Sequence, residues 1–444
     1  MPKPVFKKKG SRIDRMKLLL DKATPFESES NGHVATVSGG DTLSPAPCEG
    51  YEELLDCWKQ AMEWTDGLES ALGCMLASVV STMQVGSQLW MKIIGPASCG
   101  KSTLCEALSV NTQYVLAKST LRGFHSGYGD GTEDSSLVNA CRGKTFITKD
   151  GDTLLQAPNY QQILSEARDI YDTVSRTSYR NKASKDYSGL RMTWLLCGTA
   201  SLRSIDDSEL GERFLDCVIM DGIDDELEDR ILGMVAKKAV ANMGIEFDGT
   251  ATKQYGPELI RAMQLTGGYV TWLRETGKEQ FANLRWSTAA LNQCTRLGKF
   301  VAYMRARPSK RQEETQEREF GARLVEQHVR LASSLAIVMN KDVIDDEVMK
   351  IVKRTALDTG RGPVLDMCHR MYTTMDGLDN RAIQFATGKN TSETGKLCKF
   401  LRGIGAIQVN EKAQGGRNNR SNLFQMTAVT RALYRDVMKD LDNA

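Results

Sequence analysis

Hydrophobic positions divide the chain into a polar start, a long middle section and a shorter C-terminal section. Apolar side chains recur every three or four positions over 51–64 and 68–83, which predicts two amphipathic helices. The apolar run 88–94 then predicts a short buried strand that ends at a glycine. A helix followed by a strand and a glycine turn favours an α/β nucleotide-binding core.

Further strands and a helix are expected downstream. The run 114–118 predicts a second strand, and 143–155 predicts a core strand that ends in acidic residues. A helix is expected over 160–174, followed by strands at 177–180 and 188–198. The glycine- and aromatic-rich loop after the second strand either faces DNA or a neighbouring molecule, or is a plain surface loop.

A helical region follows the α/β pattern. Its central helix carries an apolar stripe, and the acidic residues at 345–347 suit the first turn of the next helix. The stripe comprises Phe320, Leu324, Val325, Val329, Leu331, Leu335 and Val338. The charged connector 305–319 before it is more typical of a solvated segment than of a site.

The C-terminal pattern predicts two helices and a β-hairpin. The helices are expected over 378–388 and 392–405, with Asn390 capping the second. Strands at 406–410 and 422–427 flank a polar, glycine-rich turn. Helix, turn, helix and hairpin together are a winged-helix pattern.

Basic residues on this module indicate DNA binding. Residues 378–444 hold 11 Lys and Arg against 6 Asp and Glu, a net charge of 11 − 6 = +5. The expected phosphate contacts are Lys396, Lys399 and Arg402 on the second helix and Lys412, Arg417 and Arg420 on the wing. The alternative is a winged helix that contacts only protein.

The changes in hydrophobic pattern and charge along the chain predict four domains. Residues 1–46 form a flexible arm that is basic at its start, where it binds DNA phosphates or only solubilises the chain. The α/β nucleotide-binding core spans 47–235, a helical lid region 236–376, and the winged-helix module 377–444.

Composition and charge narrow the function classes. The 444 residues are 41% hydrophobic and 26% charged, which excludes a mostly disordered chain, and no apolar run reaches the length of a membrane helix. The 58 basic and 56 acidic residues leave a net charge of only +2, but the basic residues gather in the segments expected to face DNA. Eleven scattered cysteines without CxxC pairs, and no visible signal peptide, favour a reducing cytoplasm without a structural zinc site.

The phosphate loop is the most specific motif in the chain. It fits G-x-x-x-x-G-K-[ST], follows a predicted strand and opens a predicted helix. Backbone N–H groups of such a loop surround phosphates, while Lys101 reaches the β- and γ-phosphates and Ser102 coordinates Mg²⁺. The predicted cofactors are therefore ATP and Mg²⁺. The loop comprises Gly95, Pro96, Ala97, Ser98, Cys99, Gly100, Lys101, Ser102 and Thr103.

Acidic and polar residues at later strand ends are candidates for catalysis. Asp150 and Asp152 follow the acidic strand, where a carboxylate holds Mg²⁺ and another polarises water. Asp150 is the candidate metal ligand, but Lys149-Asp150-Gly151 replaces the usual Asp-Glu pair, so the division of roles stays open; a simple turn is the alternative. Thr199, after the next core strand, is a candidate for orienting water or sensing the γ-phosphate.

Basic residues elsewhere are candidates for a neighbour's nucleotide and for DNA. Arg213 follows a short predicted helix, where it either stabilises transition-state charge on a neighbour's nucleotide or forms a surface ion pair. Lys182 and Lys185 lie in the polar segment between the strands at 177–180 and 188–198, which predicts a basic hairpin tip.

This order of motifs resembles the AAA+ ATPases over roughly residues 51–360. Within that class it resembles the clade of MCM and superfamily-three replicative helicases, and also the ATP-binding replication proteins of tailed bacteriophages. The resemblance rests on the hairpin before the sensor strand, on GERF at 211–214, and on the lid-like segment 318–354. It implies that Lys182 or Lys185 contacts DNA and that Arg323 is the sensor-2 residue; an exposed helix charge is the alternative for Arg323.

The implied function is an ATP-driven DNA translocase, a ring-shaped, hexameric replication helicase. Hydrolysis would move the hairpin along single-stranded DNA, while the winged helix binds duplex and replication proteins associate; no membrane is involved. The alternative is an AAA+ loader or regulatory ATPase that assembles on DNA without unwinding it. A transposition or defence ATPase is a third possibility.

Overall fold

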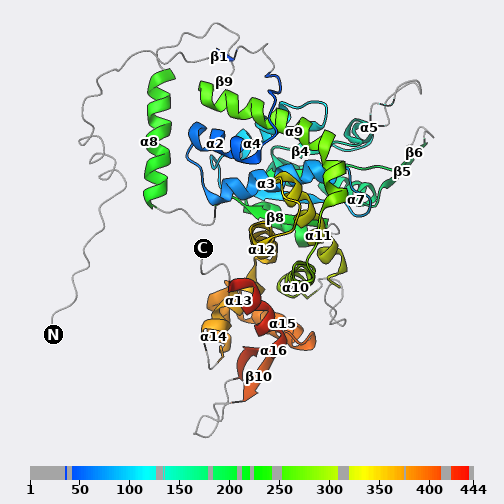
Figure 1. Cartoon of the computed structure of the whole chain (residues 1–444). Coiled ribbons are helices and arrows are strands. Elements are labelled where there is room, and N and C mark those ends of the chain that lie inside the picture. The colour runs from blue at the N-terminus through cyan, green and yellow to red at the C-terminus, as the bar shows by residue number, and fades with distance from the viewer. Residues whose placement is uncertain are drawn as a thin grey trace, which may run out of the picture.

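The computed structural model describes residues 36–37, 43–126, 134, 136–178, 184–207, 213–220, 225–242, 253–308, 320–374, 377–411 and 422–439. At its centre lies a five-stranded parallel sheet in the order β3-β4-β7-β2-β8 (Figure 1). The strands are β2 (Trp90–Ile94), β3 (Val115–Lys118), β4 (Thr145–Thr148), β7 (Thr193–Gly198) and β8 (Phe214–Val218). The expected α/β class with a parallel sheet is confirmed.

Helices cover both faces of this sheet, so its central strands are apolar on both sides. On one face, Met91 and Leu195 belong to the same hydrophobic cluster as residues of α2 (Tyr51–Ala61), α3 (Asp66–Ser81), α4 (Lys101–Ser109) and α9 (Pro257–Asn283). On the other, Trp90, Trp194 and Phe214 pack with α5 (Leu137–Cys141), α6 (Gly151–Gln156) and α7 (Tyr160–Tyr171). One ion pair interrupts the apolar interior, because Lys92 Nζ on β2 lies 3.0 Å from Asp216 Oδ1 on β8.

A β-hairpin stands between α7 and β7. Its strands are β5 (Val174–Ser178) and β6 (Ser184–Ser188). The sequence predicted two strands where the structure has three, because the run 188–198 does not continue as one strand. Gly189, with a φ of +62°, turns the chain between β6 and β7.

Within the expected lid region, three helices pack on one another: α10 (Thr288–Met304), α11 (Ala322–Val338) and α12 (Asp346–Gly360), whereas α9 of that region packs on the sheet side. Asp345 caps α12 as expected, accepting from the Val348 N–H at 3.0 Å. Helix α12 also covers the edge strand β8, where Thr359 and Asp358 accept backbone N–H groups at 2.9 and 2.8 Å. Phe320 does not join the apolar stripe of α11, because it lies before the helix and is 83% exposed.

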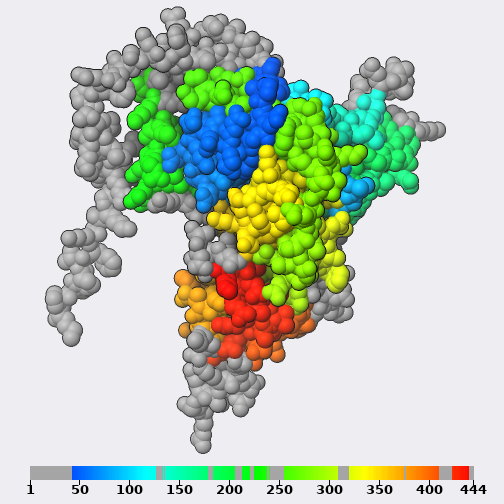
Figure 2. All heavy atoms as spheres, in the orientation of Figure 1, coloured from blue at the N-terminus to red at the C-terminus, as the bar shows by residue number. Residues whose placement is uncertain are grey.

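The C-terminal segment forms a separate lobe below the lid helices (Figures 1 and 2). It contains α13 (Pro363–Thr373), α14 (Asn380–Thr387), α15 (Thr391–Gly403), β10 (Ile407–Glu411), β11 (Asn422–Met426) and α16 (Ala428–Met438). The two predicted helices and the antiparallel hairpin are confirmed as elements, and Asn390 caps α15 in a capping box. Helix α16 lies on α10, with Arg296 and Asp436 forming an ion pair at 2.6 Å.

Two observations bear on the expected domain boundaries. Strand β1 (Thr36–Val37), inside the predicted arm, pairs with β9 (Lys253–Gln254), and the Ala46 N–H donates to Gln264 O on α9 at 2.9 Å. The expected end of the ATPase core at residue 235 falls inside α8 (Asp225–Asn242). Among the described residues, no helix combines the length and the apolar character needed to cross a membrane.

Candidate nucleotide site

The phosphate loop connects β2 to α4 by a tight turn. Gly100 has a φ of +94° and caps α4, and Ser98 also has a positive φ of 65°. A Cβ on Gly100 would lie 2.9 Å from Leu68 Cδ2, so neither the backbone angle nor the space suits a side chain. Helix α4 therefore starts at the loop, and its N-terminal N–H groups favour an anion there.

The Lys101 ammonium lies within this loop. Its Nζ donates to Gly95 O at 2.7 Å and Pro96 O at 2.6 Å, and it lies 3.5 Å from Cys99 Sγ. The Lys101 ammonium therefore donates its hydrogen bonds to carbonyls of the loop. A phosphate would have to replace these carbonyls as acceptors.

The loop, Thr199 and Asp152 meet at the carboxyl ends of neighbouring strands. The Gly95 N–H donates to Gly198 O at 3.1 Å, which joins the loop to the end of β7. Asp152 accepts from the Thr199 N–H at 3.0 Å and from its hydroxyl at 3.1 Å, and it also accepts from Ser201. Asp152 thus fixes the end of β7 beside the phosphate loop.

Asp150 has a different environment from Asp152. It caps α6, accepting from the Thr153 N–H at 3.1 Å and from the Thr153 hydroxyl, and it is exposed. Ser102, in the first turn of α4, is also exposed. Hydroxyl and carboxylate oxygens are the donors that Mg²⁺ takes in proteins, so Ser102 and Asp150 each have the chemistry of a magnesium ligand.

The two predicted arginines lie together at the opposite edge of the sheet. Arg213 directly precedes β8, whose Phe214 pairs with Trp90, and Gly95, directly after β2, lies five positions after Trp90. That separation is about 16 Å along the strand. Arg213 and Arg323 therefore lie far from the phosphate loop of their own chain.

Tyr171 brings these arginines together. The guanidinium carbons of Arg213 and Arg323 lie 5.4 and 5.8 Å from the centre of its ring. Arg213, with 9% of its side chain exposed, also pairs with Asp172 at 3.3 Å. We name this cluster of Tyr171, Asp172, Arg213 and Arg323 the arginine edge. Sequence reasoning missed Tyr171 and Asp172, because an aromatic and an acid at a helix end carry no distinguishing pattern.

Lys185 is not at a hairpin tip. It lies within β6, and its Nζ is 2.6 Å from Asp134 Oδ1 and 2.8 Å from Ser126 O. The predicted tip was too long because strand pairing begins already at Ser184.

The other predicted DNA contacts divide into two groups. Lys396, Lys399 and Arg402 are exposed on α15, whose Leu397 and Leu401 face inward as expected. Lys182, Lys412, Arg417 and Arg420 lie outside the described residues.

No protein-family model matches this chain, and no curated protein matches it.

Proposed function

We propose that the chain is an ATP-dependent DNA translocase, an AAA+ ATPase that resembles the MCM and superfamily-three replicative helicases. The observation that carries the proposal is the meeting of the phosphate loop, Thr199 and Asp152 at adjacent strand ends. Parallel α/β sheets bind ligands beyond the carboxyl ends of their strands, and this is where the nucleotide motif lies.

The chemistry follows from the side chains at that edge. Lys101 would exchange its loop carbonyls for the β- and γ-phosphates, and Ser102 with Asp150 would hold Mg²⁺. The bound Mg²⁺ would neutralise charge on the phosphates. Thr199, fixed by Asp152, would orient the attacking water, which makes Asp152 a positioning residue and leaves Asp150 as the carboxylate at the metal.

The distance between the two sheet edges supports oligomerisation. Arg213 and Arg323 lie about 16 Å along the strand from their own phosphate loop, so each nucleotide would receive them from a neighbouring copy. Arg213 would exchange its ion pair with Asp172 for a phosphate, a stronger acceptor of guanidinium hydrogen bonds. A head-to-tail contact of this kind gives a ring when the rotation between neighbouring copies closes, and a closed ring of six copies is the proposed assembly.

DNA would contact the C-terminal lobe and the hairpin β5–β6. We interpret α14, α15 and the β10–β11 hairpin as a winged helix whose exposed Lys396, Lys399 and Arg402 bind phosphates. Such contacts do not depend on base sequence, as a translocating motor requires.

Strand displacement on forked DNA tests this proposal. Wild-type protein with ATP and Mg²⁺ should release the labelled strand, and the Lys101→Ala variant should not. Lys144→Ala is a matched control, because Lys144 bonds Thr112 O at the amino end of β4, away from the nucleotide. ATP hydrolysis and DNA binding without any strand release would overturn the helicase assignment.

One observation favours a loader or regulatory ATPase as the second candidate. Lys185, one of two lysines expected to contact DNA, is bonded to Asp134 inside the hairpin instead of projecting from its tip. A loader would show ATP-dependent assembly on DNA, measured by sedimentation, in the absence of strand release.

A further inference from the structure

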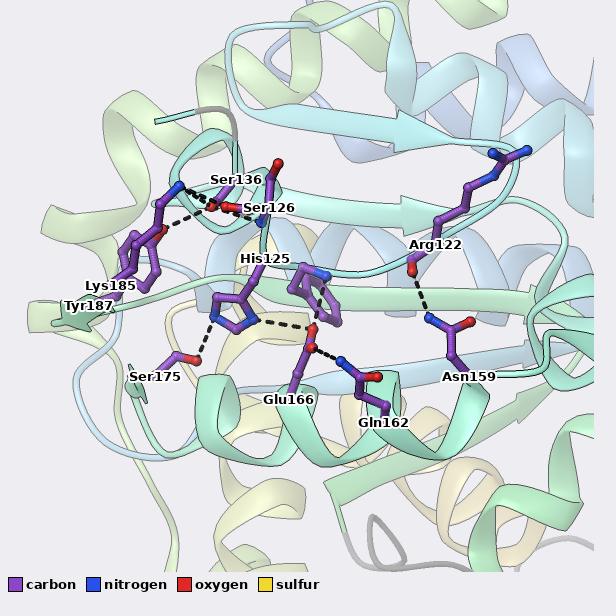
Figure 3. Close-up of polar contacts among 11 residues, drawn as sticks. Arg122, His125, Ser126, Ser136, Asn159, Gln162, Glu166, Ser175, Lys185 and Tyr187 are labelled. Atoms are coloured by element: carbon purple, nitrogen blue, oxygen red, sulfur yellow. Dashed lines mark hydrogen bonds and ion pairs between the residues drawn. The ribbon is translucent and has the colours of Figure 1, made fainter. Parts of the chain in front are cut away.

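A connected set of polar contacts joins the hairpin β5–β6 to its surroundings (Figure 3). Three parts of the chain contribute: the hairpin itself, helix α7, and the described residues 119–126, 134 and 136 of the segment between β3 and α5. We use the name β3–α5 loop for these described residues alone. Two groups of these contacts lie at the hairpin, one at each of its strands.

The first group joins β6 to the β3–α5 loop. Lys185 Nζ donates to Ser126 O at 2.8 Å and to Asp134 Oδ1 at 2.6 Å. The Tyr187 hydroxyl, on the same strand and nearly buried, donates to Asp134 Oδ2 at 2.7 Å and lies 2.9 Å from Ser136 Oγ. Both carboxylate oxygens of Asp134 are therefore bonded to β6.

The lowered pKa of Asp134 is consistent with its close contacts to β6. Partial burial raises the pKa of this carboxyl, but hydrogen bonds from Lys185, Tyr187 and Ser136 outweigh burial and lower it below its usual range. Asp134 is consequently ionised at neutral pH and forms an ion pair with Lys185.

The second group joins β5 and the β3–α5 loop to α7. His125 Nε2 lies 2.8 Å from Ser175 Oγ on β5, and its Nδ1 lies 3.2 Å from Glu166 Oε2 on α7. Glu166 also accepts from the Phe124 N–H at 3.1 Å. The His125 ring is only 3% exposed, so it is packed between β5 and α7, as Figure 3 shows.

Helix α7 carries these contacts to the arginine edge. Its last residue is Tyr171, which Arg213 and Arg323 contact, and β5 begins three residues later at Val174. The hairpin and the arginine edge are therefore attached to the same short helix.

We propose that Lys185 is a positioning residue that, with Tyr187 and Asp134, fastens the β3–α5 loop to the hairpin, while His125 fastens both to α7. The hairpin, the loop and α7 then move as one body when the arginine edge engages a neighbour's nucleotide. This inference rests on the proposed function for its role in DNA translocation, but the contacts within one chain do not depend on it.

The two roles of Lys185 make opposite predictions for Asp134. If Lys185 bound DNA, Asp134→Lys would remove a competing acid, add a base, and leave DNA-stimulated ATP hydrolysis unchanged or raise it. If Lys185 fastens the loop, Asp134→Lys places two cations together and should reduce that stimulation about tenfold, as should Lys185→Asp. The double variant Lys185→Asp/Asp134→Lys restores the ion pair with reversed charges, but not the hydrogen bonds that Asp134 accepts from Tyr187 and Ser136, so it should recover part of the stimulation.

Amide hydrogen exchange of β6 and α5 in the same four proteins, without DNA, provides the second measurement. The inference predicts about tenfold faster exchange in each single variant and clearly slower exchange in the double variant than in either single variant. Nucleotide affinity should be the same in all four, because neither residue belongs to the nucleotide site. The inference is overturned if exchange is unchanged in the single variants, or if the double variant is no better than they are.

These measurements also separate the inference from the function. Wild-type protein that hydrolyses ATP without stimulation by DNA would contradict the proposed translocase, while the exchange pattern would still decide whether the ion pair fastens the loop. DNA stimulation that is lost in Lys185→Asp and not recovered in the double variant would make Lys185 a direct DNA contact.

Discussion

Charged residues have different environments at the carboxyl edge of the central sheet, where the parallel strands end, and at its amino edge, where they begin. At the carboxyl edge, Asp150 and Ser102 are exposed and Lys101 is bonded only within its own loop. At the amino edge, Arg213 is almost buried against Tyr171 and Asp172. Two polar side chains of the first edge are thus exposed, whereas Arg213 at the second edge already contacts Tyr171 and Asp172 of its own chain. A change at the carboxyl edge should therefore affect nucleotide chemistry with little effect on stability, and a change at the amino edge should affect both.

The largest expected effect is at the carboxyl edge. Lys101→Ala removes the ammonium that would stabilise phosphate charge, so ATP hydrolysis should fall about 10²- to 10³-fold. Its melting temperature should stay close to that of wild type, because Lys101 contacts only backbone carbonyls and Cys99. Steady-state hydrolysis and thermal denaturation measure these two outcomes. A large loss of stability would contradict the claim that changes at the carboxyl edge affect nucleotide chemistry more than folding.

The free energy of unfolding should depend on pH through a residue of α11, the helix that carries Arg323 of the amino edge. The expected change is similar in free energy to the effect of Lys101→Ala. Burial lowers the pKa of His328 in this helix to about 4, against 6.5 for the free side chain. The unfolded chain binds a proton between those pH values and the folded chain does not, so stability falls as the pH drops from 6.5 to 4. At 1.36 kcal/mol per unit, the loss is about 3 kcal/mol.

Denaturant titrations at several pH values test this dependence on His328. His328→Gln should lose most of it, while His369→Gln should retain it, because His369 lies on α13 against Tyr434. Equal slopes in all three proteins would show that buried His328 does not titrate as its burial requires.

A smaller effect is expected from the exposed face of α15. Replacing Lys396, Lys399 and Arg402 by Ala should weaken duplex binding about tenfold and reduce the slope of log K against log salt by about 2 to 3. Nucleotide affinity should not change, since these three residues lie on α15 and make none of the contacts described for the phosphate loop, Thr199 and Asp152. Fluorescence anisotropy at several salt concentrations measures the slope, and an unchanged slope would leave the C-terminal lobe as a protein-contacting module.

The smallest effect is expected from the cap of the same helix. Asn390 accepts from the Glu393 N–H at 3.0 Å in the capping box, so Asn390→Ala should cost about 1 kcal/mol of stability. Asn390→Asp keeps the acceptor and should retain most of that stability. Chemical denaturation distinguishes the two variants, and equal losses in both would mean that the cap hydrogen bond is not the cause.

The carboxyl edge was largely predictable from sequence because its residues follow strands. The phosphate loop has a specific spacing, and parallel strands bring their carboxyl ends together. The sequence therefore predicts Thr199 and Asp152 as site residues, and the structure brings them into contact. The caps at Asn390 and Asp345 were predictable for a similar reason, since capping is decided within four residues.

The amino edge was less predictable because no sequence motif and no position at the carboxyl end of a strand marks its contacts. Arg213 and Asp172 are separated by 41 residues and Lys185 and Asp134 by 51, and neither pair leaves a local pattern. Lys185 was expected at a solvated tip because polar residues surround it, but strand pairing with Thr177 places it inside the hairpin. Phe320 was expected inside for its apolar side chain, yet α11 begins only after it.

The central claim is that one copy supplies the phosphate loop and a neighbouring copy supplies the arginine edge. Mixing two inactive variants, Lys101→Ala and Arg213→Ala, tests it most directly. In a random equal mixture about a quarter of the contacts would join an intact loop to an intact arginine, so ATP hydrolysis should recover to about a quarter of the wild-type rate. A mixture as inactive as its components would contradict the account, because it would mean that both residues act within one chain or that no such contact forms.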